Sequence, residues 1–311
     1  MKQIFLICAI VAAFYACQKN NSSPNSGGRN NPGRTVTDTL MVYAQTLSTG
    51  KSVIQTKYFG TNEIKTLVTG ATDPFAQSLR MVYIKNGTTL GFSRFDGISR
   101  PIAQLTQGSY PTLSIDMKLI CVVDKPLDKY QLLLYDTLGN RTLLFESVNE
   151  VKSPAFSSDG SKIVFAQKTG DASSLFIIPI TGGSPKKVTN VIAGYYDDYC
   201  TITDQTVYFV RSHFIDSTLS SEIFSSDFGG SAVQQVTNFT NNWSTPSFWI
   251  KNLRKVATLI DSSSLICVSN YNNSNSEVFL YKIGGSDLTR MTETEEMESS
   301  PNMIPNYTKN Q

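Results

Sequence analysis

A unit of about forty residues recurs along this chain, and the recurrence limits the possible folds more than any other feature. The clearest copy starts at Pro154, passes through Asp159-Gly160, and ends in the turn Gly182-Gly183-Ser184 followed by Val188-Thr189. The marker proline also stands at Pro74, Pro111, Pro246 and Pro301, and Asp198 occupies its place between Pro154 and Pro246. A unit this small must bury its apolar faces against neighbouring copies.

Each copy predicts four short β-strands. Its apolar runs are about five residues long, rich in β-branched and aromatic residues, and bounded by turn residues. Examples are MVYIK (81–85), LICVV (119–123), KIVFA (162–166), TVYFV (206–210) and EVFLYKI (277–283). Asp-Gly suits the first hairpin, Gly-Gly-Ser turns the third strand into the fourth, and proline is tolerated where the first strand begins. Because many runs are apolar throughout, both faces of each sheet should be covered.

Radial stacking of such sheets predicts an all-β fold, a β-propeller. Residues 299–311 predict a first strand alone, whereas residues 38–69 predict strands two to four without a first. We therefore expect a six-bladed propeller of four-stranded blades, closed by a blade shared between the N- and C-termini, with no free sheet edge. The region after Pro246 is overlong, so a seventh partial blade is the alternative.

The copy from Ser153 to Asn190 resembles the repeat of TolB-type, WD-like β-propellers. The shared pattern is Ser-Pro, an aromatic residue, Asp-Gly, an apolar strand, and Gly-Gly before a Val/Leu-Thr pair. The resemblance extends over roughly residues 37–308 and is weaker in the N-terminal copies, which lack Asp-Gly at the first turn. It implies a propeller domain over residues 37–311. Because the tether runs straight into strands, we expect no separate TolB-like N-terminal α/β domain, so the translocation role of TolB does not carry over automatically.

The first residues predict a lipoprotein signal peptide over residues 1–16. Lys2 supplies a positive start, residues 4–14 are apolar but too few to span a bilayer comfortably, and small Ala16 precedes Cys17. This pattern resembles the signal of bacterial, Bacteroidetes-like lipoproteins, although Phe14 stands where the family usually has Leu. The resemblance implies lipid attachment at Cys17; the alternative is an ordinary cleaved signal with an incidental cysteine.

Residues 17–36 predict a lipidated cysteine followed by a flexible tether. The segment is rich in Asn, Ser, Gly and Pro and has almost nothing apolar to bury. Lipid would hold the protein at a membrane while the tether lets the domain move. Gln18 follows Cys17, without an acidic retention residue. By resemblance to lipoprotein sorting, we expect the periplasmic face of the outer membrane.

The remaining composition points away from several classes of site. A net charge of +2 implies no general attraction to nucleic acid. Cys121, Cys200 and Cys267 lie in apolar runs, which predicts buried thiols, with a disulfide as the alternative. His213 is the only histidine and is expected in an enlarged loop. Without a nucleophile motif, metal-ligand spacing or a phosphate loop, we expect no catalytic residue, metal or cofactor.

The candidate binding surface lies at the loops that join the fourth strand of one blade to the first strand of the next. These loops should emerge on one face of the ring. They carry acids and aromatic residues: Asp73, Tyr110, Glu146, Glu150, Tyr195, Tyr196, Asp197, Trp243, Glu293, Glu295, Glu296 and Glu298. Aromatic residues beside polar groups suit contact with a protein or a sugar.

Two classes of function follow. The first is an envelope-anchored, non-catalytic scaffold or receptor that binds a protein or peptide at the acidic face. The alternative is a carbohydrate-binding propeller, or a glycan-active enzyme that uses two carboxylates. Carboxylates facing each other across an enclosed channel within about 5–10 Å would favour the enzyme. Acids spread around an open rim would favour the scaffold.

Overall fold

The computed structural model describes residues 35–95, 98–215, 217–239, 249–255, 264–271 and 275–310. The predicted signal peptide, Cys17 and nearly all of the tether lie outside these residues, as do Trp243 and Pro246. Residues 37–309 form one compact unit. Within the described ranges, no helix has the length and apolar character needed to cross a membrane.

Four of the sheets have four strands each. The first has the order β24 (Met297–Asn310), β1 (Thr35–Thr46), β2 (Ser52–Tyr58), β3 (Glu63–Thr69). The second has the order β4 (Ala71–Gln77), β5 (Arg80–Lys85), β6 (Thr89–Arg94), β7 (Ser99–Gln104). The third has the order β8 (Gly108–Leu113), β9 (Leu119–Asp124), β10 (Tyr130–Asp136), β11 (Arg141–Ser147). The fourth has the order β20 (Ile250–Lys255), β21 (Ser264–Ser269), β22 (Glu277–Lys282), β23 (Leu288–Arg290).

The remaining sheet contains two antiparallel groups of strands. One group is β12 (Val151–Phe156), β13 (Lys162–Thr169), β14 (Ala172–Pro179), β15 (Lys186–Lys187). The other is β16 (Tyr195–Thr203), β17 (Thr206–Ile215), β18 (Thr218–Asp227), β19 (Gln234–Gln235). A single parallel pair, Ser173 with Tyr196, joins β14 to β16. The two groups are therefore held together far more weakly than the strands within each.

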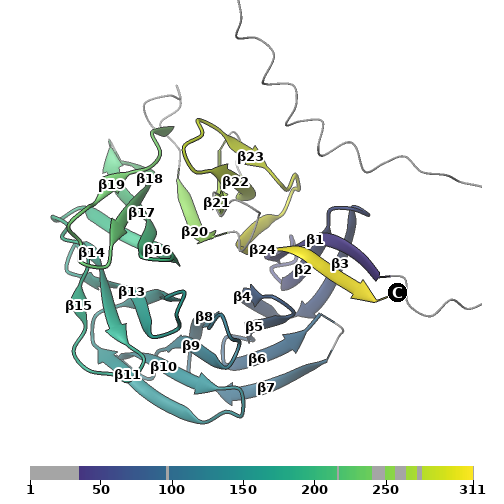
Figure 1. Cartoon of the computed structure of the whole chain (residues 1–311), viewed down its shortest axis with the longest axis horizontal. Helices are drawn as coiled ribbons and strands as arrows, with labels where there is room; N and C mark the ends of the chain where they lie inside the picture. Colours follow the sequence, from purple (N-terminus) through teal and green to yellow (C-terminus); the bar gives the residue numbers. More distant parts are fainter. Residues whose placement is uncertain are drawn as a thin grey trace, which may run out of the picture. The chain divides into compact units, whose positions relative to one another are not determined.

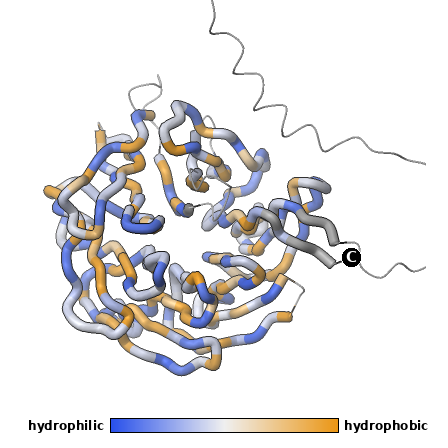
Figure 2. The backbone as a smooth tube through the Cα atoms, in the orientation of Figure 1, coloured by the Kyte–Doolittle hydropathy of each residue, from blue (hydrophilic) through white to orange (hydrophobic). Residues whose placement is uncertain are grey.

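The sheets of residues 37–309 stand side by side around a common centre, with β4, β8, β16, β20 and β24 nearest to it (Figure 1). β12 belongs with them, because it contacts both β8 and β16. This arrangement confirms the predicted all-β propeller. Apolar residues recur along the strands all around the centre (Figure 2). Every residue of β21 is buried, and so are five of the six residues of β9, which confirms that both sheet faces are covered.

The buried apolar residues in the described part of the chain form six clusters. Each cluster joins residues of one strand group to residues of the next group. One combines Val164 of β13 with Phe209 of β17, across the weak seam of the eight-stranded sheet. Another combines Val268 of β21 with Met41 of β1 and Met303 of β24. Burial between groups, rather than strand pairing, therefore holds neighbouring groups together.

One residue near the start of each innermost strand has a left-handed backbone. These residues are Asp73 (φ 51°), Tyr110 (φ 50°), Ser153 (φ 53°), Tyr199 (φ 50°), Asn252 (φ 56°) and Ser300 (φ 49°). In the first five, the pairing with the next strand shifts register there, which marks a β-bulge. Such a backbone costs about 1–2 kcal/mol per non-glycine residue, so its recurrence marks a required feature of the strand.

The left-handed residue explains where the marker proline stands, and it changes the alignment of two copies of the repeat. Pro74, Pro111, Pro154 and Pro301 each follow a left-handed residue directly. At the first three, the bulge leaves the ladder unpaired, so a missing N–H is tolerated. In β16 the matching residue is Cys200, not Asp198 as the sequence predicted. In β20 it is Leu253, so Pro246, which lies outside the described residues, does not mark this strand.

The ends of the repeats also have a structural reason. The side-chain hydroxyls of Thr189, Thr237 and Thr292 accept the backbone N–H of Leu175, Ile223 and Val278 at 2.9, 2.8 and 2.9 Å. In the last of these copies the hydroxyl comes from Thr292, not from Thr289 of the Leu288-Thr289 pair that follows the Gly-Gly-Ser turn. In one Gly-Gly-Ser turn, a Cβ on Gly230 would lie 1.9 Å from the carbonyl oxygen of Val188, and φ is +72°. Only glycine fits there.

Candidate functional site

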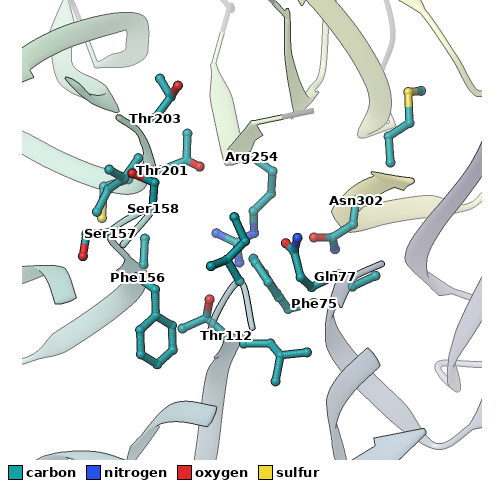
Figure 3. Close-up of a pocket in the computed structure, with 17 residues that line it drawn as sticks. Phe75, Gln77, Thr112, Phe156, Ser157, Ser158, Thr201, Thr203, Arg254 and Asn302 are labelled. Carbon is teal, nitrogen blue, oxygen red and sulfur yellow. The ribbon is translucent and has the colours of Figure 1, made fainter. Parts of the chain in front are cut away.

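A cavity of about 230 Å³, here called the central pocket, lies among the innermost strands. Its wall contains residues of β4, β8, β12, β16, β20 and β24 and of the turns that follow some of them (Figure 3). Phe75, Leu113, Phe156 and Met303 make part of the wall apolar. The pocket lies beyond the bulges, toward the ends of these strands. It is thus at the opposite end of the strands from the loops in which the acidic surface was predicted.

One position repeats around the pocket, two residues after each left-handed residue. It is occupied by Phe75, Thr112, Ala155, Thr201, Arg254 and Asn302, and all six line the pocket. Arg254 is the only charged residue among the described residues of the wall. Figure 3 shows its guanidinium group in the middle of the labelled side chains. The pocket is therefore a mostly neutral cavity with a single cation inside it.

Arg254 is buried without an adequate partner. It is 6% exposed; among the described residues its Nε has no hydrogen-bond partner, and its Nη1 donates to the Leu253 carbonyl oxygen at 3.5 Å. None of the described carboxylates forms an ion pair with it. The guanidinium lies 5.5 Å from the centre of the Phe75 ring. Burial lowers the pKa of Arg254, but an arginine stays charged.

Several of the left-handed residues lie near Arg254. Asp73 Oδ1 accepts from the hydroxyl of Ser300 at 3.1 Å. Asp73, Tyr110 and Tyr199 are all close enough to Arg254 to influence its pKa. Burial raises the pKa of Asp73 and of both phenols. Asp73 and Tyr110 were predicted in surface loops; they lie instead in β4 and β8, within the ring.

Asp197 and Asp198 are structural partners rather than exposed acids. Asp197 is fully buried and accepts from Arg211 Nε and Nη2 at 2.7 and 2.8 Å. Asp198 Oδ2 lies 2.9 Å from Lys152 Nζ, and its Oδ1 accepts from Ser173 Oγ at 3.0 Å. Burial raises the pKa of Asp198, opposed chiefly by Lys152. Asp197 is therefore not part of an exposed acidic surface, contrary to the sequence-based prediction.

Glu298 is also buried, at 1% exposure, beside Glu277 at 0%. Glu298 Oε1 accepts from Thr294 Oγ1 at 2.5 Å, and Glu277 Oε1 accepts from Arg290 Nη2 at 2.8 Å. Burial and the neighbouring Glu277 raise the pKa of Glu298 to about 7. Burial alone would raise the pKa of Glu277, but hydrogen bonds from Thr292, Thr294 and Arg290 lower it. Glu298 therefore holds a proton while Glu277 carries the charge.

The other predicted surface residues are dispersed. Glu150 is partly exposed near Lys152, and Glu146 pairs with Lys129 at 2.6 Å. Tyr195 stacks on His213 with ring centres 4.9 Å apart, and Tyr196 donates a hydrogen bond to Asp171. Glu293 and Glu295 are exposed and Glu296 partly so, whereas Trp243 lies outside the described residues. Binding at this surface stays a prediction.

Two further expectations concern the histidine and the cysteines. His213 lies within β17, not in an enlarged loop. Cys121, Cys200 and Cys267 are buried and free, as predicted, and burial raises the pKa of each thiol. In the described ranges, no group of three or more His, Cys, Asp or Glu side chains is placed to hold a metal ion.

Comparison with known proteins gives the fold. No family model and no curated protein matches the sequence. Among solved structures, TolB from Acinetobacter baumannii superposes with a TM-score of 0.67 at 12% identity, covering 86% of this chain and 66% of that chain. One chain of a nidogen/laminin complex gives 0.64 at 10% identity, covering 85% and 98%. An oligogalacturonate lyase in complex with manganese gives 0.56 at 14% identity, covering 85% and 86%.

The fold is a WD-like β-propeller. Its structural neighbours include TolB, as the resemblance of the repeat predicted. Identities of 10–14% show a shared fold and nothing more. These three neighbours also have unrelated names: TolB, a laminin or nidogen chain, and a lyase. Function therefore has to be argued from the pocket and its residues.

Proposed function

We propose that this protein is a non-catalytic scaffold or receptor that takes a segment of a protein or peptide partner into the central pocket. The observation that carries the proposal is the pocket wall. All the innermost strands contribute to it, apolar side chains cover much of it, and none of its described residues is Asp, Glu or His. A glycoside hydrolase of the usual kind needs two carboxylates across the bound sugar. A mostly apolar cavity with a few placed polar groups is instead the usual form of a binding site.

The proposal includes a ring of six four-stranded blades. The eight-stranded sheet counts as two blades, because the only strand pairing between its halves in the described residues is Ser173–Tyr196. The six left-handed residues, one on each innermost strand, support the same count. Closure would come from the sheet in which β24 lies beside β1, supported by the cluster that joins Val268 to Met41 and Met303. Opening of the ring would separate the strands that line the pocket.

The proposal also includes anchoring at the envelope. Residues 1–16 would be removed as a signal peptide, Cys17 would carry lipid, and residues 17–36 would tether the propeller, at the periplasmic face of the outer membrane. The support is the basic start, the short apolar run and Ala16-Cys17. In membrane fractionation, Cys17→Ala should move the protein from the membrane to the soluble periplasmic fraction. Membrane retention of this variant would contradict lipid anchoring.

Capture of the cellular partner by variants distinguishes binding in the pocket from binding at the acidic surface. Gln77 is the last residue of β4 and lines the pocket, so Gln77→Trp should obstruct it. The matched control is Gln104→Trp, on the exposed side of the outermost strand β7. After crosslinking in the native cell and mass spectrometry, Gln77→Trp should lose a partner that wild type, Gln104→Trp and the double variant Glu295→Lys/Glu296→Lys all retain. Loss only in the double variant would place binding at the acidic surface instead.

A further inference from the structure

We propose that Arg254 makes the central pocket a carboxylate subsite, and that the segment received there is the C-terminal residue of a peptide, with an apolar side chain. This inference rests on the proposed function and deepens it, since it names the chemistry of the captured segment. It brings together the unpartnered guanidinium and the apolar wall around it.

The first argument is the state of the guanidinium. Burying a cation is costly unless it is paired and hydrogen-bonded, and most buried arginines have such partners. In the described residues only two buried side-chain polar atoms lack a hydrogen-bond partner, Arg254 Nε and Ser153 Oγ. Both belong to innermost strands, β20 and β12. A carboxylate that binds Nε and one terminal nitrogen together would satisfy Arg254 in the geometry that guanidinium groups favour.

The second argument is that none of the described carboxylates forms an ion pair with Arg254. Asp73 is close enough to influence the pKa of Arg254, but its Oδ1 accepts from Ser300. Asp198 is held by Lys152 and Ser173. These two described acids therefore bind other groups, which leaves a place beside Arg254 for the carboxylate of a ligand.

The third argument is size and polarity. A volume of about 230 Å³ lies below the roughly 300–1,000 Å³ of pockets for drug-sized ligands. It suits the last residue of a chain. Phe75, Leu113, Phe156 and Met303 would surround its side chain. Asn302 Nδ2 donates to the Pro74 and Ser300 carbonyls at 2.8 and 3.0 Å, which leaves its Oδ1 to accept the N–H of that residue.

The arrangement of polar groups supports this docking. Gln77, Asn302 and Arg254 all line the pocket, and in the view of Figure 3 the two amide groups and the guanidinium group face the same space. The pocket thus offers an acceptor and a cation, as the N–H and carboxylate of a terminal residue require. An acidic sugar would match only part of the wall, because Thr112, Ser157 and Thr201 offer hydrogen bonds to its hydroxyl groups but Phe75, Leu113 and Met303 do not. The larger apolar share of the wall therefore favours an apolar peptide end over a glycan.

Calorimetric titration of the full-length protein in detergent tests the inference. The probes are N-acetyl-Ala-Ala-Leu as the free acid, the same peptide as its C-terminal amide, N-acetyl-leucine and a galacturonate trimer. Wild type should bind the acid at least tenfold more tightly than the amide, and more tightly than N-acetyl-leucine or the trimer. Arg254→Gln should reduce the acid-to-amide ratio below twofold. Arg141→Gln, at an exposed arginine on β11, should keep the wild-type ratio.

Several results would overturn the inference. Wild type could bind neither peptide, bind acid and amide equally, or keep its acid preference in Arg254→Gln. Equal affinity for N-acetyl-leucine would assign the subsite to small apolar acids, and tighter binding of the trimer would assign it to glycans. If Gln77→Trp loses the cellular partner while acid and amide bind alike, the inference fails and the proposed function stands. If Gln77→Trp captures the partner as wild type does, the proposed function itself fails.

Discussion

Two arginines in this propeller, Arg211, which is partly buried, and Arg254, which is buried, differ in what surrounds them. Arg211 of β17 lies directly across the ladder from Asp197 of β16, and the two side chains form a doubly hydrogen-bonded ion pair. Arg254 of β20 lies against the ring of Phe75, as Arg211 lies against that of Phe224, but it forms no ion pair with any described carboxylate. The charge of Arg211 is paired within its own sheet. The charge of Arg254 is left for a ligand, and this difference separates a structural charge from a binding one.

The largest expected effect comes from breaking the satisfied pair. Arg211→Met leaves Asp197 fully buried without its cation, and removing one partner of a buried pair typically costs about 3–5 kcal/mol. The free energy of unfolding, measured by urea titration, should fall by that amount. Arg141→Met is the matched control at an exposed arginine and should change it by less than about 0.5 kcal/mol. A small loss in Arg211→Met would mean that the pair is not structural.

The buried carboxyl pair Glu277–Glu298 extends the comparison to the pH dependence of stability. The pKa of Glu298 is raised from 4.5 to about 7 in the folded protein. As pH rises from 4.5 toward 7, the unfolded chain loses this proton while the folded chain keeps it, so stability falls. The full loss is about 3 kcal/mol at pH 8. Glu277, whose pKa is lowered, acts oppositely, since its contribution is lost as pH falls through that lowered value.

Glu298→Gln should remove most of the loss between pH 4.5 and 7, because the amide stays neutral and keeps the contact with Thr294. Urea titrations of wild type and variant at pH 5 and pH 8 measure the difference. We expect similar stability at pH 5 and a more stable variant at pH 8. Equal pH dependence in the two proteins would show that Glu298 does not hold the proton. Glu295→Gln, at an exposed acid, is the matched control.

In the absence of ligand, Arg254→Met should not lower the free energy of unfolding, whereas Arg211→Met should. The change removes an unpartnered buried cation and leaves an apolar chain of similar length against Phe75. Unfolding free energy should stay the same or rise by about 1 kcal/mol. The measurement is the same urea titration, with Arg211→Met alongside. A loss near that of Arg211→Met would mean that Arg254 is a structural residue and that the two arginines do not differ in kind.

The strands and the repeat could be predicted because their signals are local. Asp159-Gly160 and the Gly-Gly-Ser turns specify hairpins through backbone conformation alone. Apolar runs such as 119–123 report burial on both sheet faces without knowledge of the neighbouring sheet. The prediction of buried free thiols at Cys121, Cys200 and Cys267 succeeded for the same reason.

The pocket could not be predicted because it depends on aligning all the innermost strands. Tyr199 and Asn252 adopt the left-handed backbone without a following proline, so nothing local marks β16 and β20. With this copy aligned on Pro246, Arg254 was not among the predicted site residues. Aligned on Asn252, it stands where other strands have Phe75, Thr112, Ala155, Thr201 and Asn302. The sequence predicted too many residues for the acidic surface. A position outside the predicted strands does not show whether a side chain is exposed, and Asp197 and Glu298 are in fact buried.

The smallest effect on the free energy of unfolding is expected at the exposed acids. Glu295 is exposed, and among the described residues Asn275 Nδ2 donates a hydrogen bond to its backbone oxygen at 2.8 Å. Its charge is solvated, so Glu295→Lys should change the free energy of unfolding by less than about 0.5 kcal/mol. Urea titration checks this against Arg211→Met in the same buffer. A large loss would mean that exposed charges also matter to this fold, and that burial alone does not separate structural charges from the rest.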